Sequence, residues 1–157
     1  MTTIELRRRL RSLLGGGRGW SEDALRKRRV GVIGERAAAR ACRRAGMRVI
    51  GRNLRLSAGE VDLLCLERDR WTLVVVEVKA GRVGAATPLS SPEQHVDAGK
   101  ARTLQTLCRS LARANGWTDR PWRIDVVGVD VDGRGRAVRV RRHRGMVPAP
   151  QFDTPRP

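Results

Sequence analysis

Two short acidic motifs lie on neighbouring stretches that have the residue pattern of β-strands. The sequence Gly-Glu-Val-Asp contains Glu60 and Asp62, and the sequence Val-Glu-Val-Lys contains Glu77 and Lys79. Because side chains alternate along a strand, the two polar residues of each motif share one face. If the two strands pair, Asp62 and Glu77 approach each other with Lys79 beside them.

Such a group of side chains has the chemistry of a metal-dependent hydrolase. Two converging carboxylates repel, and a divalent cation relieves the repulsion; Mg²⁺ suits oxygen ligands, with Mn²⁺ as an alternative. The metal would lower the pKa of a bound water and stabilise charge on a phosphodiester oxygen. Lys79 would orient or deprotonate that water, or neutralise the phosphate. Glu60, on the same face as Asp62, is a further candidate ligand.

Lysine usage supports a special role for Lys79. Lys27, Lys79 and Lys100 are the only lysines among 33 basic residues. A chain that prefers arginine so strongly keeps at position 79 a compact charge whose pKa can shift, which arginine cannot provide. A surface-charge explanation is therefore weaker for Lys79 than for Lys27.

The competing interpretation is that these motifs are ordinary surface ion pairs. Acid-x-acid and Glu-x-Lys pairs occur by chance, and a single pair is more often an ion pair on an edge strand. Their joint placement on consecutive predicted strands of a basic protein favours a site.

The formal net charge of +17 and the pI near 11.7 favour a polyanionic partner. Phosphate contacts release condensed counterions, which drives binding of basic proteins to nucleic acid. An anionic membrane would need a basic helix with a continuous apolar face, and none is evident beyond residues 1–14. An arginine-biased proteome would also raise the charge. Nucleic acid is the favoured partner.

The three cysteines are odd in number and far apart, and with the two histidines they make no zinc spacing. No apolar run approaches the length of a membrane span, and no signal-peptide core follows the arginine-rich N-terminus. We therefore expect a cytoplasmic protein without a membrane partner.

Hydrophobic periodicity predicts an α/β protein with a mixed sheet. We expect an N-terminal appendage at residues 1–29, with a short amphipathic helix at 4–14, a globular domain at 30–146 and a loose tail at 147–157. One helix runs from residue 32 to a stop at Gly46, and another starts at Ser91-Pro92-Glu93 and ends at Asn115-Gly116. Strands are expected at residues 47–50, 54–66 with a bend at 57–59, 71–78, 123–131 and 137–140. Between them lie a polar turn at 67–70, a loop at 80–90 and a turn at 132–135.

The two acidic motifs together resemble the PD-(D/E)XK nuclease signature. More closely, the chain resembles the bacterial YraN-type family, related to archaeal Holliday-junction resolvases and predicted to be endonucleases. The resemblance runs from about residue 31 to residue 131. It includes Gly34-Glu35-Arg36-Ala37-Ala38, Arg52-Asn53-Leu54-Arg55, Lys100-Ala101-Arg102 and Arg123-Ile124-Asp125-Val126-Val127.

The resemblance implies a restriction-endonuclease-like αβββαβ core, a central mixed sheet flanked by helices. It implies that Asp62 and Glu77 are metal ligands and Lys79 the catalytic lysine. Glu35 would be the helix carboxylate that reaches the metal; equally, it is an acid favoured near a helix N-terminus by the helix dipole. Phosphate contacts are expected from Arg52, Arg55, Arg82, Lys100 and Arg102. Arg82 lies one position later than the arginine that usually follows the catalytic lysine.

The leading hypothesis is a Mg²⁺-dependent endonuclease-like protein that hydrolyses phosphodiesters in structured or branched DNA. The alternative is a DNA-binding recombination or repair accessory protein that keeps the fold with little or no cleavage. An RNA-binding module is a third reading, but the chain lacks the aromatic-basic signature of common RNA folds. A homodimer would suit the two symmetric strands of a junction. His95 is more simply a surface residue than a proton shuttle, and Trp117 and Trp122 are expected to pack rather than stack on bases.

Overall fold

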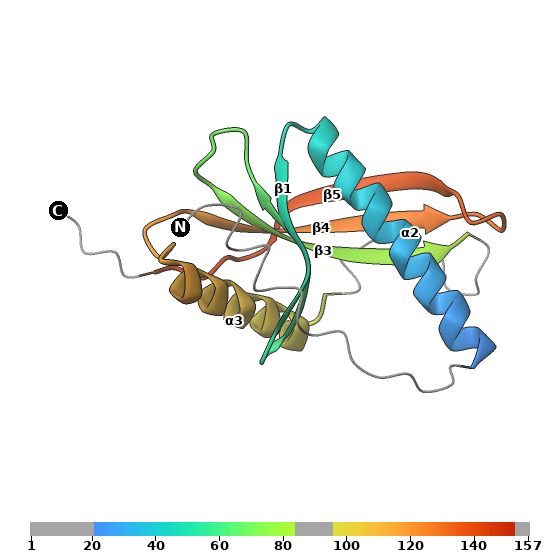
Figure 1. The fold of residues 1–157 in the computed structure, drawn as a ribbon, viewed down its shortest axis with the longest axis horizontal. Helices are drawn as coiled ribbons and strands as arrows, with labels where there is room; N and C mark the ends of the chain where they lie inside the picture. Colours follow the sequence, from blue (N-terminus) through green and yellow to red (C-terminus); the bar gives the residue numbers. More distant parts are fainter. Residues whose placement is uncertain (1–20, 84–95, 153–157) are drawn as a thin grey trace.

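A five-stranded mixed sheet with one helix on each face makes up the part of the chain that the computed structural model describes, residues 21–83 and 96–152 (Figure 1). In chain order the elements are α2 (Glu22–Arg44), β1 (Arg48–Leu56), β2 (Gly59–Leu66), β3 (Leu73–Arg82), α3 (Ala98–Asn115), β4 (Trp122–Val131) and β5 (Ala137–Val147). The strands lie in the order β1-β2-β3-β4-β5. Only β3 and β4 pair in parallel. This confirms the predicted α/β fold, consistent with a restriction-endonuclease-like core.

Strand β3 is the centre of the sheet and is covered on both faces. Its run from Leu73 to Val76 is fully buried, as its unbroken β-branched sequence predicts. Leu73 and Val75 belong to the core beneath α3, whereas Val74 and Val76 belong to the core beneath α2. The far end of β3, where polar residues replace valine, is therefore held between two packed layers.

Helix α2 begins ten residues earlier than the periodicity predicts. The Ser21 side chain accepts a hydrogen bond from the Ala24 N–H, and two acids occupy the first turn, which is a favourable helix start. The helix therefore crosses the expected boundary between residues 29 and 30. The basic stretch 26–29 is an exposed part of α2 rather than a tail. The predicted helix at residues 4–14 lies outside the described residues.

Small residues let α2 approach the sheet closely. Its buried residues are Gly34, Ala37, Ala38, Ala39 and Cys42. A Cβ added to Gly34 would lie 2.4 Å from the Cβ of Ala80 on β3, so position 34 has no room for a side chain. The sequence of this face thus brings the helix backbone next to the polar end of β3.

We expect Gly34→Ala to lower the free energy of unfolding by about 1–3 kcal/mol, because the methyl group forces α2 away from β3. That loss exceeds the gain of about 1 kcal/mol in helix propensity. Gly31→Ala is the matched control: no atom lies within 4 Å of its added Cβ, so it should be neutral or stabilising. Urea denaturation measures both, and equal stabilisation by the two substitutions would contradict the close approach.

The predicted start of the second helix is wrong. Helix α3 begins at Ala98, where the Asp97 side chain accepts a hydrogen bond of 2.7 Å from the Lys100 N–H. The predicted start at Ser91 lies outside the described residues, as does His95. The buried stripe of Leu104, Leu107, Cys108 and Leu111 and the stop at Gly116 are confirmed.

The C-terminal part is more ordered than predicted. Strand β5 extends to Val147 instead of ending at residue 140. Beyond it, Pro150 is buried and the Phe152 ring lies 6.3 Å from that of Trp122. Residues 147–152 therefore pack on the core instead of forming a loose tail. Trp122 is buried and Trp117 half-buried, so both are packing residues, as expected. No helix in the described ranges is long and apolar enough to cross a membrane.

Candidate functional site

Asp62 lies where β2 leaves its pairing with β3. The ladder between these strands ends at Leu63 and Val76. Asp62 comes one residue before Leu63 on β2, and its Oδ2 atom accepts a hydrogen bond of 2.7 Å from the Val78 N–H. A side-chain contact thus replaces the next backbone pair and fixes the Asp62 carboxylate beside the polar end of β3.

Glu77 is a buried carboxylate held by two lysines. Only 4% of the surface of Glu77 is exposed to solvent. The Lys79 Nζ atom lies 2.9 Å from Oε1, and the Lys100 Nζ atom lies 2.9 Å from Oε2. Lys100 reaches this position from the first turn of α3, so helix and strand meet at Glu77.

A cavity of about 420 Å³ opens beside these residues, between α2 and the end of β3. Its lining consists of Lys27, Gly31, Glu35, Asp62, Val78, Lys79 and Ala80. The α2 members recur every four residues, which places them on one face of the helix. Glu77 does not line the cavity, but it pairs with Lys79, which does line it. The cavity therefore gives solvent access to Asp62, Lys79 and Glu35.

All three lysines of the chain gather here. Lys27 lines the cavity, while Lys79 and Lys100 hold Glu77. Lysine supplies a compact charge with a titratable proton, unlike arginine. Each lysine of this arginine-rich chain therefore lies in or next to one region, the end of β3 and the cavity beside it.

The pKa of Asp62 is raised to about 6 from an ordinary value of 3.8. Burial is the largest cause, followed by the charge of Glu77, and Glu35 adds to the increase. The hydrogen bond from Val78 and the charge of Lys100 oppose it without cancelling it. A perturbed carboxylate next to an open cavity is typical of a functional site.

We expect Asp62→Asn to stabilise the metal-free protein at alkaline pH. Because the folded state holds the Asp62 proton more tightly, this residue favours folding below pH 3.8, and its contribution is lost as pH rises through about 6. The shift corresponds to up to about 3 kcal/mol. Urea denaturation in EDTA should show a larger advantage of Asp62→Asn over the wild type at pH 8 than at pH 5.

Glu60→Gln is the matched control, since Glu60 is an exposed acid on the same strand. It should change stability little at either pH. An Asp62→Asn variant less stable than the wild type at pH 8 would show that the ionised carboxylate is favourably held, contrary to the arrangement described.

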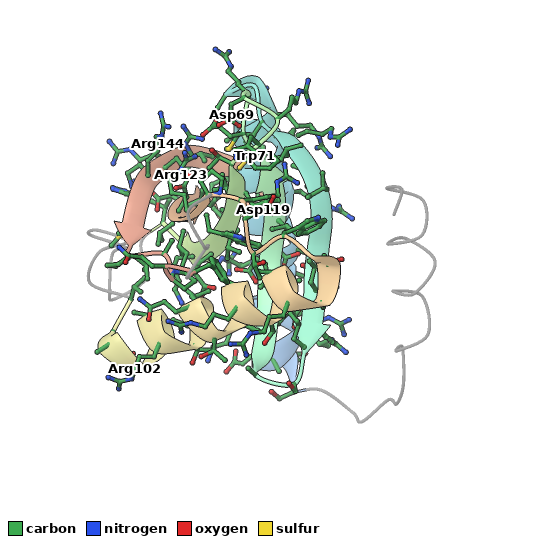
Figure 2. The ribbon with its side chains drawn as sticks, turned by 90° about the vertical axis from the view of Figure 1, so that its left-hand side faces the viewer. Asp69, Trp71, Arg102, Asp119, Arg123 and Arg144 are labelled. Atoms are coloured by element: carbon green, nitrogen blue, oxygen red, sulfur yellow. The ribbon has the colours of Figure 1, made fainter. Side chains whose placement is uncertain are left out.

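The other predicted site residues lie apart from the cavity. Glu60 is exposed and pairs with Arg55 at 3.7 Å, opposite it in the β1–β2 ladder. Arg52 is exposed on β1, and Arg102 projects outward from α3 (Figure 2). The guanidinium of Arg82 donates to the Gly133 carbonyl at 3.2 Å. Among residues 21–83 and 96–152, no three acidic, histidine or cysteine side chains gather as a metal site.

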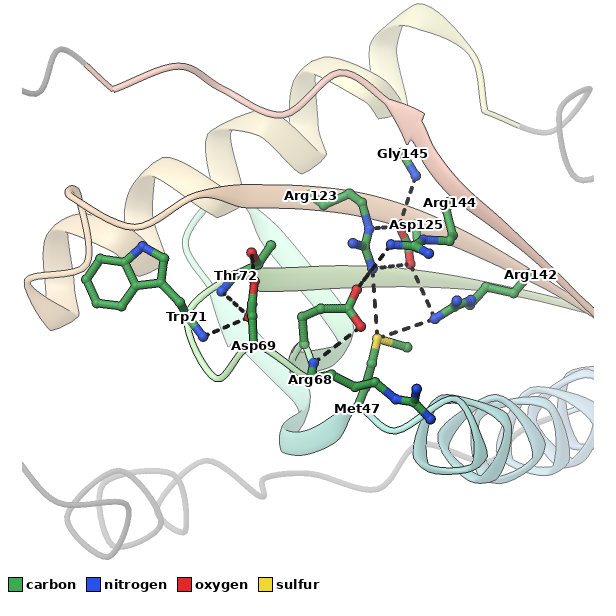
Figure 3. A network of polar contacts seen from close by, with 11 residues as sticks. Met47, Arg68, Asp69, Trp71, Thr72, Arg123, Asp125, Arg142, Arg144 and Gly145 are labelled. Carbon is green, nitrogen blue, oxygen red and sulfur yellow. Dashed lines mark hydrogen bonds and ion pairs between the residues drawn. The ribbon is translucent and has the colours of Figure 1, made fainter.

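A second polar network lies nearer the start of β4 (Figure 3). Asp125, with no exposed surface, accepts hydrogen bonds from the Arg123 side chain at 2.7 and 3.2 Å and from the Gly145 N–H at 2.9 Å. Arg123 also pairs with Glu67, which Arg144 reaches from β5. These groups satisfy one another, so the network stabilises the fold rather than serving as an open site.

Sequence reasoning missed the place of two residues. The sequence predicts Lys27 in the N-terminal appendage and Lys100 as a phosphate contact, but Lys27 lines the cavity and Lys100 pairs with Glu77. The scarcity of lysine was the signal that could have grouped them with Lys79. The residues Asp62, Glu77, Lys79 and Glu35 are brought to one region, whereas Glu60 is not.

The chain is similar to proteins of one bacterial family over most of its length. The model of the "Uncharacterised protein family UPF0102" matches residues 34–129. A UPF0102 protein of Symbiobacterium thermophilum is 39% identical over 69% of this chain and 88% of the relative. One from Kineococcus radiotolerans is 41% identical over 69% and 85%, and one from Roseiflexus castenholzii is 36% identical over 73% and 90%. The matched region holds Glu35, Asp62, Glu77 and Lys79. The chain therefore belongs to the UPF0102 family, the YraN-type family that its motifs resemble.

Proposed function

We propose that this protein is a metal-dependent endonuclease-like enzyme that hydrolyses phosphodiester bonds in structured or branched DNA. One observation carries the proposal: the carboxylates of Asp62 and Glu77 share the end of β3 with every lysine of a chain of +17 charge. Acids that would repel a phosphodiester are here combined with cations that attract it. A divalent cation bound by the acids would remove their repulsion of the phosphodiester.

The donor atoms fit a hard cation such as Mg²⁺ or Mn²⁺. Asp62 uses Oδ2 for the Val78 N–H, which leaves Oδ1 without a described hydrogen bond. Glu77 is buried, with Lys79 at 2.9 Å from Oε1 and Lys100 at 2.9 Å from Oε2. Asp62 would hold the ion from the cavity, Glu77 would bind it when the ion displaces the Lys79 ammonium, and Glu35 would act from the α2 side of the cavity on a water of the ion. Carboxylate oxygens with room for waters are what Mg²⁺ prefers.

The bound ion would supply Lewis acidity and a water of lowered pKa. The remaining chemistry belongs to the chain. Lys79, at the cavity wall, would orient the attacking water or stabilise charge on the phosphate. Lys100, paired with Glu77 behind the wall, would keep that carboxylate in place. Lys27, across the cavity on α2, would attract the phosphate.

The test is incubation of the protein with end-labelled four-way junction, nicked, flap and linear duplex DNA in Mg²⁺ or Mn²⁺. We expect cleavage that requires the metal and is faster on branched or nicked DNA than on linear duplex. Binding without cleavage in either metal would contradict the proposal and favour a DNA-binding accessory protein instead. Equal cleavage of all four substrates would contradict the proposed preference for structure.

A further inference from the structure

A second hollow lies on the other side of the same helix. This groove, of about 530 Å³, is lined by Arg26, Arg29, Val30, Ile33, Arg82, Val131, Asp132, Gly133, Arg134 and Gly135. It lies between α2, the end of β3 and the turn that joins β4 to β5. A Cβ added to Gly135 would lie 3.6 Å from the Ile33 side chain, so the turn and the helix are close neighbours.

The groove is positively charged. Four of its lining residues are arginine and one is acidic. The acid, Asp132, is already used: it accepts hydrogen bonds from the N–H groups of Arg134 and Arg136 and pairs with the Arg136 side chain at 3.0 Å. Its carboxylate therefore does little to neutralise the arginines of the groove.

Two of the arginines are available to a ligand. Arg29 and Arg134 are exposed, and neither forms an ion pair within residues 21–83 and 96–152. Arg26 pairs with Glu22 at 3.7 Å between side chains that are 64% and 89% exposed. Exposed pairs of this kind contribute little and are readily exchanged for a phosphate. Arg82 instead holds the turn in place through the Gly133 carbonyl.

The groove and the candidate site are built from the same helix and strand. Helix α2 gives Lys27 and Glu35 to the cavity, and Arg26 and Arg29 to the groove. Strand β3 gives Lys79 to the cavity and Arg82 to the groove. The two sets of α2 residues overlap along the helix and face opposite sides of it, so the helix, about 10–12 Å across with its side chains, separates the cavity from the groove. At a rise of about 3.4 Å per nucleotide, a DNA strand that crosses the exposed residues 26–29 of α2 would pass from the cavity to the groove within a few nucleotides.

We propose that this groove binds the phosphate backbone of duplex DNA beside the candidate cleavage site, with Arg29 and Arg134 as the contacting residues. The proposal rests on the proposed function, since it places the DNA that the cavity would act upon. Arginine suits the role because its planar fork binds phosphate oxygens in pairs. The contact carries no sequence information and fixes the position of the duplex.

The experiment measures the affinity of the full chain for fluorescein-labelled linear duplex DNA in EDTA, between about 50 and 200 mM salt. The double variant Arg29→Gln, Arg134→Gln is compared with Arg109→Gln, Arg113→Gln, which removes the same charge from exposed positions on α3. We expect the groove variant to reduce the slope of log K against log salt by about 2, one phosphate contact for each arginine. The α3 variant should keep the slope of the wild type. Circular dichroism melting checks that both variants remain folded.

Equal slopes for the two double variants would overturn the groove proposal, because a general charge effect would then explain both. Loss of affinity for an RNA duplex but not for DNA would overturn it in favour of an RNA ligand. Since binding in EDTA does not require cleavage, the two proposals fail separately. A wild type that never cleaves but shows the groove effect refutes only the enzyme, and a groove variant that cleaves and binds like the wild type refutes only the groove.

Discussion

Replacement of Lys79 by methionine should lower the rate of metal-dependent DNA cleavage by about 10²–10³-fold, the usual cost of removing one electrostatic stabiliser of a transition state. Lys79 lines the cavity and its Nζ atom lies 2.9 Å from Glu77. Its ammonium should act mainly on charge that develops during reaction, so kcat and kcat/KM should fall together. Single-turnover cleavage of a labelled junction measures the rate.

Two further variants distinguish a chemical role of Lys79 from the effect of losing a positive charge. Lys79→Arg keeps the positive charge but loses the titratable, compact ammonium, and should also be severely impaired if that property matters. Arg102→Met removes a charge from an exposed site on α3 and should cleave nearly as fast as the wild type. A Lys79→Met variant that melts like the wild type and cleaves at its rate would exclude Lys79 from catalysis.

Replacement of Asp125 by alanine should lower the free energy of unfolding by about 3–5 kcal/mol, the cost of breaking a buried ion pair from one side. Asp125 has no exposed surface and receives three hydrogen bonds from Arg123 and Gly145. Without it, the half-buried Arg123 guanidinium keeps only Glu67 as an ion-pair partner among the described residues. Chemical denaturation at neutral pH measures the loss.

Glu22→Ala is the contrasting control. Glu22 also pairs with an arginine, but its side chain is 89% exposed, so its removal should cost less than about 1 kcal/mol. The double variant Arg123→Met, Asp125→Asn should recover part of the loss, because both charges leave the interior together. Similar stabilities for Asp125→Ala and Glu22→Ala would contradict the structural role of the network.

The strands were predictable because short runs of consecutive residues indicate which strand positions are buried. The run Leu73–Val76 has a β-branched sequence suited to a strand covered on both faces, and it is buried on both. Helix starts were less predictable. Ser91 and Asp97 are both good N-caps by type, and the side chain of Asp97 caps the helix. The extension of β5 depends on pairing with the start of β4, where Val147 lies opposite Ile124 and His143 opposite Val126.

The candidate site was predictable where it depends on strand alternation and not where it depends on helix docking. Glu77 and Lys79 share a face by period alone, and they pair. Lys27 and Lys100 lie on helices that are distant in sequence from β3, so their position next to the site depends on which face of each helix packs on the sheet. The close approach of Gly34 to Ala80 sets that arrangement for α2. Glu60 does not belong to the site because it lies at the exposed start of β2, where Arg55 pairs with it.

The proposed metal ligand is tested by the rate at which a four-way junction is cut in Mg²⁺ by the wild type and by Asp62→Asn, prepared in parallel. Asp62→Asn keeps an oxygen that can accept the Val78 N–H but removes the charge that would hold the cation. We expect metal-dependent cleavage by the wild type and none detectable with Asp62→Asn, although both bind the junction. Equal cleavage by the two proteins, or a wild type that binds without cutting, would contradict this expectation.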